Sequence, residues 1–223
     1  MTTLRGVRVL PKIVGVFGAW SVVFAPHASA DAVVSPVKIE TLLLSDDEVS
    51  TIIGLPLHRV GKAFPAPAPP GPPGEHSECR VFTESDAGKW TGEFTAYRQI
   101  QQEDNPDNLQ FADQQMIAVY PKAQTAAQTF QKAFPSDLGN RCGPVAMPDA
   151  DSHVQWKMDG IAITGSGSRW MSIELYDGQD IMWHCANEVR LKSNVMYQDQ
   201  VCQYGNGSSL ATQMADMTAS RFP

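Results

Sequence analysis

Short segments in which apolar and polar residues alternate occupy much of the second half of the chain. This period of two is typical of β-strands, whose successive side chains point to opposite faces of a sheet. Asp159–Gly160, residues 165–168 and Asp177–Gly178 separate these segments, and turn-forming residues at such short intervals favour β-hairpins. We therefore predict an antiparallel meander with strands at 90–101, 113–120, 154–158, 161–164 and 170–176.

Three other segments have features of amphipathic helices. Ser45 and Glu48 match the capping box S-x-x-E and Gly54 is a natural stop, so we expect a helix at 46–53. Apolar residues at helical spacing predict two more helices, at 123–134 and 209–221. Residues 31–44, before the first helix, are expected to be an exposed lead-in. Helices packed on an antiparallel sheet make the predicted fold class α+β.

The strongest hairpin signal lies in residues 181–204. If the chain reverses at Ser193–Asn194, residues pair across the two strands when their numbers sum to 387. Cys185 and Cys202 then lie directly opposite one another. In a non-hydrogen-bonded antiparallel pair the Cα atoms are about 4.5 Å apart, which is within reach of a disulfide. The turn position and the cysteine spacing therefore agree on a disulfide-linked hairpin.

The same register divides this hairpin into two faces. One face holds both cysteines and most large apolar side chains, and we expect it to join the core. On the other face Glu188 is opposite Asp199, and Arg190 can neutralise both carboxylates. Our interpretation is a solvent-exposed Glu–Arg–Asp cluster. The alternative is a polar patch that contacts a ligand, formed by His184, Glu188, Arg190 and Asp199.

The chain has four cysteines, which predict two disulfides in an exported protein. Because the hairpin pairs Cys185 with Cys202, elimination leaves Cys79 with Cys142. Closing so long a loop stabilises a fold by roughly 4 kcal/mol in the chain-entropy model. The sequence has no C-x-x-C motif and no His/Cys cluster, so we expect no metal site and no cofactor.

The first thirty residues have the features of a secretory signal peptide. Arg5, Arg8 and Lys12 form a basic region, residues 13–24 are apolar but short, and residues 28–30 give an A-x-A cleavage site. We expect cleavage near Ala30 and a soluble mature chain, secreted or in the periplasm or cell envelope, without stable membrane insertion. An uncleaved membrane anchor is the alternative.

The charge of the chain restricts its partners. The chain has 17 Lys and Arg and 24 Asp and Glu, so its formal net charge is −7. Removal of the signal peptide takes away three basic residues, and the net charge of the mature chain is then 14 − 24 = −10. An acidic surface argues against nucleic acid and anionic lipid as partners. Cations, polar small molecules and proteins remain possible partners.

The proline-rich segment 62–74 is expected to be a surface loop, with a docking role as the alternative.

Motifs for catalysis are missing from the sequence. Ser166 and Ser168 do not match the G-x-S-x-G elbow, and the histidines form no H-x-x-x-H pair. Residues 149–160 begin like an EF-hand loop but have neither glycine at the sixth position nor glutamate at the twelfth. The acidic segment 103–108 is interpreted as a solvated turn. We therefore expect no enzymatic activity.

Several of these features together resemble a known family. The segment LLLSDDEV, the cysteine spacing, AVYPKAQTAAQTF, Trp183–Cys185, Asn194–Val195 and the last helix are similar to the PknH-like extracellular sensor domain, over residues 41–222. That resemblance implies an α+β domain with two disulfides and a cleft for an unidentified ligand. The sequence contains no kinase domain, so this chain alone is not expected to relay a signal inward.

Three functions are compatible with this sequence. The first is an exported binding domain, 45–223, that captures a small molecule or another component of the cell envelope. The second is an interaction protein that acts as an accessory to, or decoy for, a receptor with a similar domain. The third is a hydrolase in which Glu188, Asp199 or His184 acts at an unrecognised site, because paired carboxylates can serve as acid and base.

Overall fold

The computed structural model describes residues 33–69, 76–83, 90, 92–149 and 153–222. The chain divides into two units, Met1–Ala30 and Asp31–Pro223, and all described residues belong to the second. The predicted signal peptide and its cleavage site lie outside the described residues, as do the end of the proline-rich loop and Asp151.

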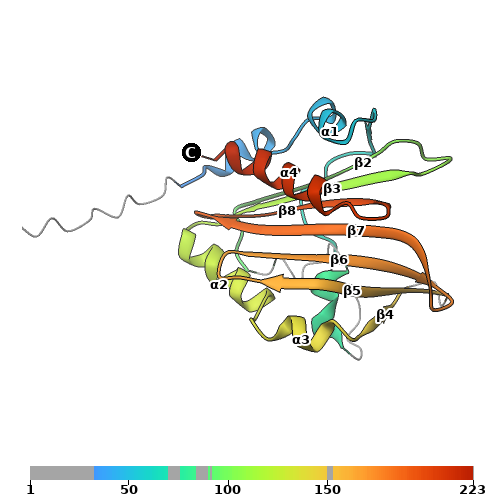
Figure 1. Cartoon of the computed structure of the whole chain (residues 1–223). Helices are drawn as coiled ribbons and strands as arrows, with labels where there is room; N and C mark the ends of the chain where they lie inside the picture. The colour runs from blue at the N-terminus through green and yellow to red at the C-terminus, as the bar shows by residue number, and fades with distance from the viewer. Residues whose placement is uncertain (1–32, 70–75, 84–89, 91, 150–152, 223) are drawn as a thin grey trace, which may run out of the picture. The chain divides into compact units, whose positions relative to one another are not determined.

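An eight-stranded antiparallel sheet forms the centre of the unit Asp31–Pro223 (Figure 1). The strand order is β1-β2-β3-β8-β7-β6-β5-β4, so two meanders meet where β3 pairs with β8. The predicted α+β fold with an antiparallel sheet is confirmed. The strands are β1 (His58–Arg59), β2 (Ala96–Glu103), β3 (Phe111–Val119), β4 (Ala146–Pro148), β5 (Val154–Ile163), β6 (Gly167–Tyr176), β7 (Gln179–Lys192) and β8 (Val195–Tyr204).

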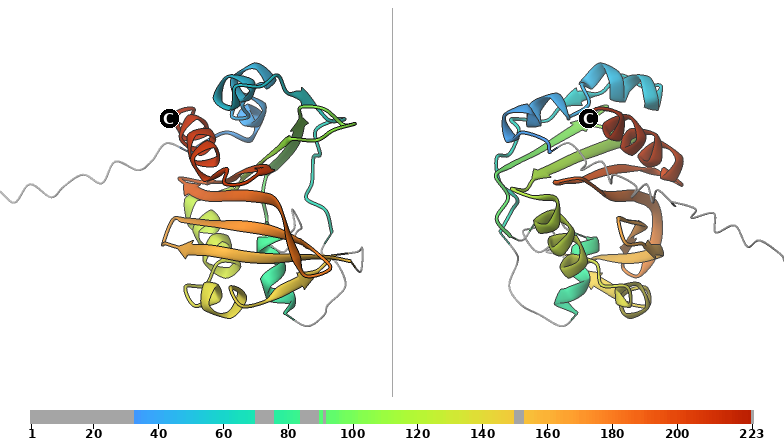
Figure 2. Two further views of the ribbon diagram at one scale, coloured as in Figure 1. Left: turned by 45° about the vertical axis from the view of Figure 1, so that its right-hand side comes forward. Right: turned by 90° about the vertical axis from the view of Figure 1, so that its left-hand side faces the viewer.

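Helices cover both faces of the sheet, as the two views of Figure 2 show. One face is covered by the 3-10 helix η1 (Pro36–Thr41) together with α1 (Asp46–Ile53) and α4 (Ser208–Ser220). The 3-10 helix η2 (Ser77–Phe82), α2 (Ala123–Ala133) and α3 (Leu138–Cys142) pack on the other. The predicted helices at 46–53, 123–134 and 209–221 are confirmed as α1, α2 and α4. The short helices η1, η2 and α3 were not predicted.

Because side chains alternate in direction along the strands, each face of the sheet has its own hydrophobic core. Val189 of β7 and Met196 of β8 pack with Phe130 of α2 on one side. Val195 and Tyr197 of β8 pack on the other side, beneath η1 and α4. Both faces of the central strands are therefore buried, which explains why β3 and β8 have nearly continuous buried positions.

Both predicted disulfides are present. Cys79 of η2 is bonded to Cys142 of α3, and Cys185 of β7 to Cys202 of β8. The hairpin register is also confirmed, because Cα partners across β7 and β8 have numbers that sum to 387. The Cys185–Cys202 Cα distance is 3.9 Å.

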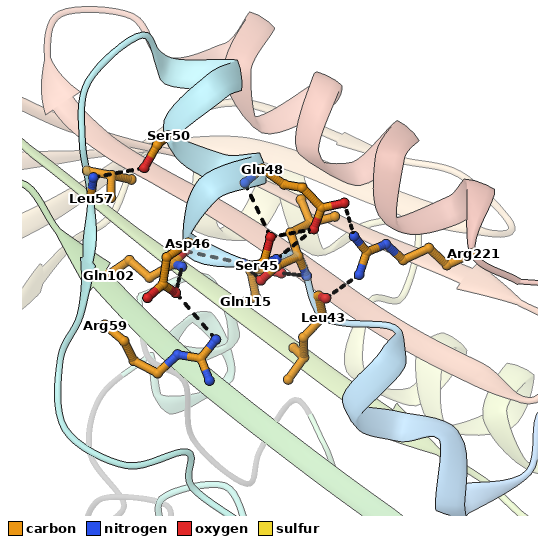
Figure 3. Close-up of polar contacts among 11 residues, drawn as sticks. Leu43, Ser45, Asp46, Glu48, Ser50, Leu57, Arg59, Gln102, Gln115 and Arg221 are labelled. Carbon is orange, nitrogen blue, oxygen red and sulfur yellow. Dashed lines mark hydrogen bonds and ion pairs between the residues drawn. The ribbon is translucent and has the colours of Figure 1, made fainter.

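The capping box of α1 forms as predicted (Figure 3). The Glu48 backbone N–H donates to the Ser45 hydroxyl oxygen, while the Ser45 N–H donates to the Glu48 carboxylate at 2.8 Å. Gly54 ends the helix in the left-handed conformation with φ of 81°. Glu48 is also 2.5 Å from Arg221, at the end of α4, so the cap links two helices.

The segment before α1 was predicted wrongly. Val34, Ile39 and residues 42–44 are buried, and several of them pack against β8 and α4. They therefore belong to the folded core, and the interpretation of this segment as an exposed lead-in is incorrect. The apolar residues of this short stretch gave no periodic signal, and their burial depends on α4, which comes more than 160 residues later.

The predicted turn at Asp159–Gly160 is also wrong. Strand β5 continues through these residues, and its pairing with β6 shifts by one residue between Asp159 and Ala162. Gly160 has φ of 60°, so the glycine forms a β-bulge in a continuous strand rather than a hairpin turn. The predicted turns at 165–168 and at Asp177–Gly178 are confirmed, although β6 already begins at Gly167.

Candidate functional site

Helix α4 leaves part of its own face of the sheet uncovered. In Figure 1, α4 crosses in front of β8 and β3, while β5 and β6 have no helix in front of them. Two hollows of about 380 and 390 Å³ lie along this uncovered part, and they share Arg169 and Glu188. We call them together the α4 groove, which is bordered by residues of β5, β6, β7 and the first turns of α4.

Glu188 is fixed in place at the centre of this groove. Its Oε1 accepts hydrogen bonds from Nε and Nη2 of Arg190, at 2.7 and 2.6 Å. The hydroxyl of Thr212, on α4, donates to Oε2 at 2.7 Å. Arg190 also donates to Asp216 of α4 at 2.7 Å. These contacts hold α4 on β7 and satisfy the Glu188 carboxylate within the protein.

The protonation of Arg190 follows from these contacts. Burial lowers its pKa, but the hydrogen bonds to Asp216 and Glu188 outweigh burial and raise the pKa above its ordinary value. Arg190 therefore stays cationic, and its charge is matched by its two carboxylate partners.

Arg169 differs from Arg190 in having no such partner. It lies on β6, and its Cα partner across the strands is Glu188. Within the described residues no hydrogen bond or ion pair to its guanidinium is found, and the side chain is exposed. Because Glu188 is already paired with Arg190, the cationic charge of Arg169 is directed to solvent in the groove.

His184 borders the same groove. Its Nε2 lies 3.0 Å from Oδ1 of Asp180, an exposed residue four positions earlier on β7. The hydrogen bonds from His184 and from the backbone N–H of Met182 lower the pKa of Asp180. The Asp180 carboxylate thus orients the imidazole at the edge of the groove.

The N-terminus of α4 completes the border. Asn206 and Ser208 line the groove, and the N-cap residue Gly207 has no side chain with which to accept the first backbone N–H groups. The Asn206 side chain accepts a hydrogen bond from the Ser208 N–H at 2.8 Å. The first turn of α4 contains no acidic residue, so the positive end of this helix is not compensated locally.

Asp199 is not part of this surface. It is opposite Glu188, as the register predicted, but it is only 1% exposed and lies beneath α4. Burial raises its pKa to about 8. The predicted solvent-exposed Glu–Arg–Asp cluster is therefore wrong, because α4 covers this face of the hairpin and pairs Arg190 with Asp216.

Of the four predicted ligand residues, three border the groove, namely His184, Glu188 and Arg190, and Asp199 does not. Glu188 and Asp199 are opposite one another, as the hydrolase hypothesis requires, but only Glu188 lines the groove because Asp199 is buried. Sequence reasoning missed Arg169, Thr212 and Asp216. Arg169 lies on the same face of the sheet as Glu188, but this was not visible because the Asp159–Gly160 bulge and the β6–β7 register were not predicted.

The other candidates lie elsewhere. Ser166 is in the exposed turn between β5 and β6, and Ser168 is buried. His153 is 2.7 Å from Asp177, near the β6–β7 turn. Among the described residues no three His, Cys, Asp or Glu side chains are grouped so as to hold a metal ion. The absence of a metal, of a cofactor and of catalysis stays a prediction.

A family model supplies the observation that identifies the chain. The model of the PknH-like extracellular domain matches residues 34–221. The chain belongs to this family. The match begins at residue 34 rather than at 41, in agreement with the burial of Val34 and the following segment in this PknH-like domain.

A solved structure shares the fold of this PknH-like domain. The crystal structure of the extracellular domain of PknH from Mycobacterium tuberculosis superposes with a TM-score of 0.73 at 17% sequence identity. The match covers 86% of this chain and 97% of the PknH chain. A comparison with curated proteins finds no match. None of the helices described here is long and apolar enough to cross a membrane.

Proposed function

We propose that this PknH-like domain is an exported binding domain of the cell envelope whose α4 groove takes a small ligand with an anionic group. The observation that carries this proposal is the unpaired guanidinium of Arg169, which faces the groove opposite a glutamate that is already neutralised. A cation with no partner among the residues described here is available to a carboxylate or phosphate, which arginine binds in bidentate geometry.

Two neighbouring features support the same ligand chemistry. The N-terminus of α4 supplies the positive end of a thirteen-residue helix, which favours negative charge. His184, whose Nε2 is bonded to Asp180, borders the groove and can donate to an anion through Nδ1 in its imidazolium form. Arg169 is on β6, His184 is on β7, and the helix N-terminus belongs to α4. The groove therefore has three contact points on three separate elements.

Thermal unfolding in inorganic phosphate tests this proposal. The unfolding temperature of the protein is compared in phosphate and in chloride at equal ionic strength and pH. We expect phosphate to raise it in a saturable manner, because a ligand that binds only the folded state stabilises it as its concentration exceeds the dissociation constant. Arg169→Gln should abolish this increase.

Lys132→Gln is the matched control. Lys132 is exposed on α2, on the opposite face of the sheet, so its replacement removes one positive charge without touching the groove. This variant should retain the full response to phosphate. An equal response of wild type and Arg169→Gln would show that phosphate acts elsewhere, and the absence of any response would exclude phosphate and its close analogues as ligands.

A further inference from the structure

A separate hollow of about 260 Å³ lies on the other face of the sheet, the face that also carries α2, α3 and η2. It is found where Cys185 and Cys202 join β7 to β8. Trp156 and Trp183 also line it, together with the polar residues Glu174 and Gln200. We call this hollow the tryptophan pocket. It is on the opposite side of the sheet from the α4 groove, so neither site depends on the other.

The two tryptophans have a different environment from the other described tryptophans. Trp90 and Trp170 are 1% and 3% exposed and belong to the core. Trp156 and Trp183 are half-buried and border the hollow. The Trp156 indole N–H donates to Asp149 at 2.8 Å, and Trp183 packs edge-on against Tyr204 with ring centroids 5.3 Å apart. These contacts hold both rings in defined orientations.

A hydrogen-bonded row behind the pocket fixes the amide of Gln200. Asn187 donates to the carbonyl of Cys185 at 2.8 Å, so its own Oδ1 is an acceptor. Gln200 Nε2 donates to that oxygen at 2.8 Å, and Gln198 Nε2 donates to it at 2.9 Å. The Gln200 amide oxygen is consequently left without a partner among the described residues, and it is a hydrogen-bond acceptor at the pocket.

The charge of the lining is negative. Glu174 is the charged residue that lines the pocket; it is directly opposite Trp156 across β5 and β6. Among the described residues no Lys or Arg lines the pocket or pairs with Glu174. Burial, and then the nearby charge of Asp149, raise the pKa of Glu174.

We propose that the tryptophan pocket binds a small organic cation, an ammonium group with an apolar body. The indole ring is the aromatic side chain that attracts cations most strongly, and paired aromatic walls are used to bind quaternary ammonium groups. The Glu174 carboxylate supplies the counter-charge, and the Gln200 oxygen accepts a hydrogen bond from an N–H. The same negative charge disfavours an anionic ligand. The volume lies just below the usual range of about 300–1,000 Å³ for small-molecule sites, which suits a compact ligand.

Titration with tetramethylammonium chloride, with tryptophan fluorescence as the readout, tests this inference. The folded protein is titrated in parallel with sodium chloride at the same ionic strength and with glucose, a neutral ring. We expect a saturable change with tetramethylammonium alone, because Trp156 and Trp183 line the pocket. A response to sodium chloride of the same size, or no saturable response to tetramethylammonium, would overturn the proposal. A saturable response to glucose alone would assign the pocket to neutral rings and also overturn it.

Variants separate the charge of the pocket from its rings. Glu174→Gln should weaken tetramethylammonium binding about tenfold, in keeping with the loss of a partly desolvated charge contact. Glu93→Gln is the matched control, because Glu93 is exposed and lies outside the pocket. It should bind as wild type does. Unchanged binding by Glu174→Gln would contradict the proposal.

The ring contribution is measured with Trp183→Leu and Trp183→Phe, using the ligand-dependent increase in unfolding temperature as the readout. Leucine removes the aromatic face and should abolish the increase, whereas phenylalanine should retain part of it. If Trp183→Leu does not fold, Trp183→Phe and Glu174→Gln still decide the result. An undiminished increase in both Trp183 variants would show that the rings do not bind the cation.

Discussion

The side chain of Asn194, in the turn between β7 and β8, contacts two segments that are distant in sequence. Its Oδ1 accepts a hydrogen bond from the Val34 N–H at 2.7 Å. Its Nδ2 donates to the carbonyl oxygens of Val34 and Tyr120, at 3.0 and 2.7 Å. Because Asn194 is buried, these backbone groups have no access to water as an alternative partner. One residue thus attaches the segment before η1 to the central strands.

Replacement of this residue should be strongly destabilising. We expect Asn194→Ala to lower the free energy of unfolding by about 3 kcal/mol, because three hydrogen bonds are lost and buried backbone groups are left unpaired. Urea denaturation measures the change. Asn140→Ala, at an exposed position of α3, should change stability by less than about 0.5 kcal/mol. A loss below 1 kcal/mol for Asn194→Ala would contradict this account of the turn.

Asp199 makes the stability of the domain depend on pH. Its pKa is raised by burial to about 8 in the folded state, above the usual value of 3.8. The folded state therefore binds the proton more tightly than the unfolded state, and stability falls as pH rises from about 4 to about 8. Asp199→Asn stays neutral throughout this window. The variant should be more stable than wild type at pH 8.5 by about 2 kcal/mol or more, and similar at pH 4.5.

Urea denaturation at the two pH values tests whether stability falls as pH rises. Asp47→Asn, which neutralises an exposed carboxylate of α1, is the control and should not alter the pH dependence. Asp113 is a second buried carboxylate whose pKa is raised by burial and by Asp199, so Asp199→Asn is expected to remove only part of the dependence. A wild-type stability that rises between pH 4.5 and 8.5 would exclude this mechanism.

At the scale of elements, the cap of α1 connects the start of the domain to its end. Ser45 and Glu48 close the helix, and Glu48 continues to Arg221, which also donates to the carbonyl oxygen of Leu43 (Figure 3). The hydrogen bond to Arg221 lowers the pKa of Glu48 to about 2. The carboxylate is therefore ionised across the ordinary pH range and available for both contacts.

Ser45→Ala tests the cap. We expect a loss of about 1 kcal/mol in the free energy of unfolding, the usual effect of removing an N-cap hydroxyl. Ser166→Ala, in the exposed turn between β5 and β6, is a control with the same chemical change and should be close to neutral. Urea denaturation of both variants gives the comparison, and equal losses would show that the cap contributes nothing specific.

The elements that could be predicted from sequence are those fixed by local chemistry. Ser45, Glu48 and Gly54 encode the ends of α1 within ten residues, and the turn at Ser193–Asn194 encodes the β7–β8 register. Gly160 shows the limit of such reasoning. Its positive φ suits a turn as well as a bulge, and the choice depends on pairing with β6, which lies further along the chain.

The candidate site could be predicted less well because it depends on contacts between distant segments. His184, Glu188 and Arg190 were placed on one face by the alternation of β7 alone, and this was correct. Whether that face meets solvent depends on α4, which returns over β8 and buries Asp199. No local pattern indicates which face a terminal helix will cover, so Asp199 was misplaced and Arg169 was missed.

At the scale of the whole domain, the two disulfides close loops of different length. Cys79 and Cys142 are separated by 63 residues, and Cys185 and Cys202 by 17. In the chain-entropy model these loops correspond to about 4 and about 3 kcal/mol of stabilisation. The longer one also joins η2 to α3, within the core that contains α2.

The loss of stability on removing each disulfide should be larger for the disulfide that closes the longer loop. The double variant Cys79→Ala with Cys142→Ala should lose about 1 kcal/mol more than Cys185→Ala with Cys202→Ala, because a longer loop is released in the unfolded state. Urea denaturation of the two double variants under identical conditions measures the difference. The opposite order would mean that the strand pairing of β7 and β8 depends on its disulfide more than loop entropy predicts.

The sheet ends at each side in a very short strand, β1 with two residues and β4 with three, the latter finishing at Pro148. Strands this short offer few hydrogen-bonding groups of their own to a strand from another molecule, and proline offers no N–H at all. Fibrils and dimers built by lateral strand addition are thereby discouraged. The faces of the sheet, rather than its borders, are in this way left for contacts with other molecules.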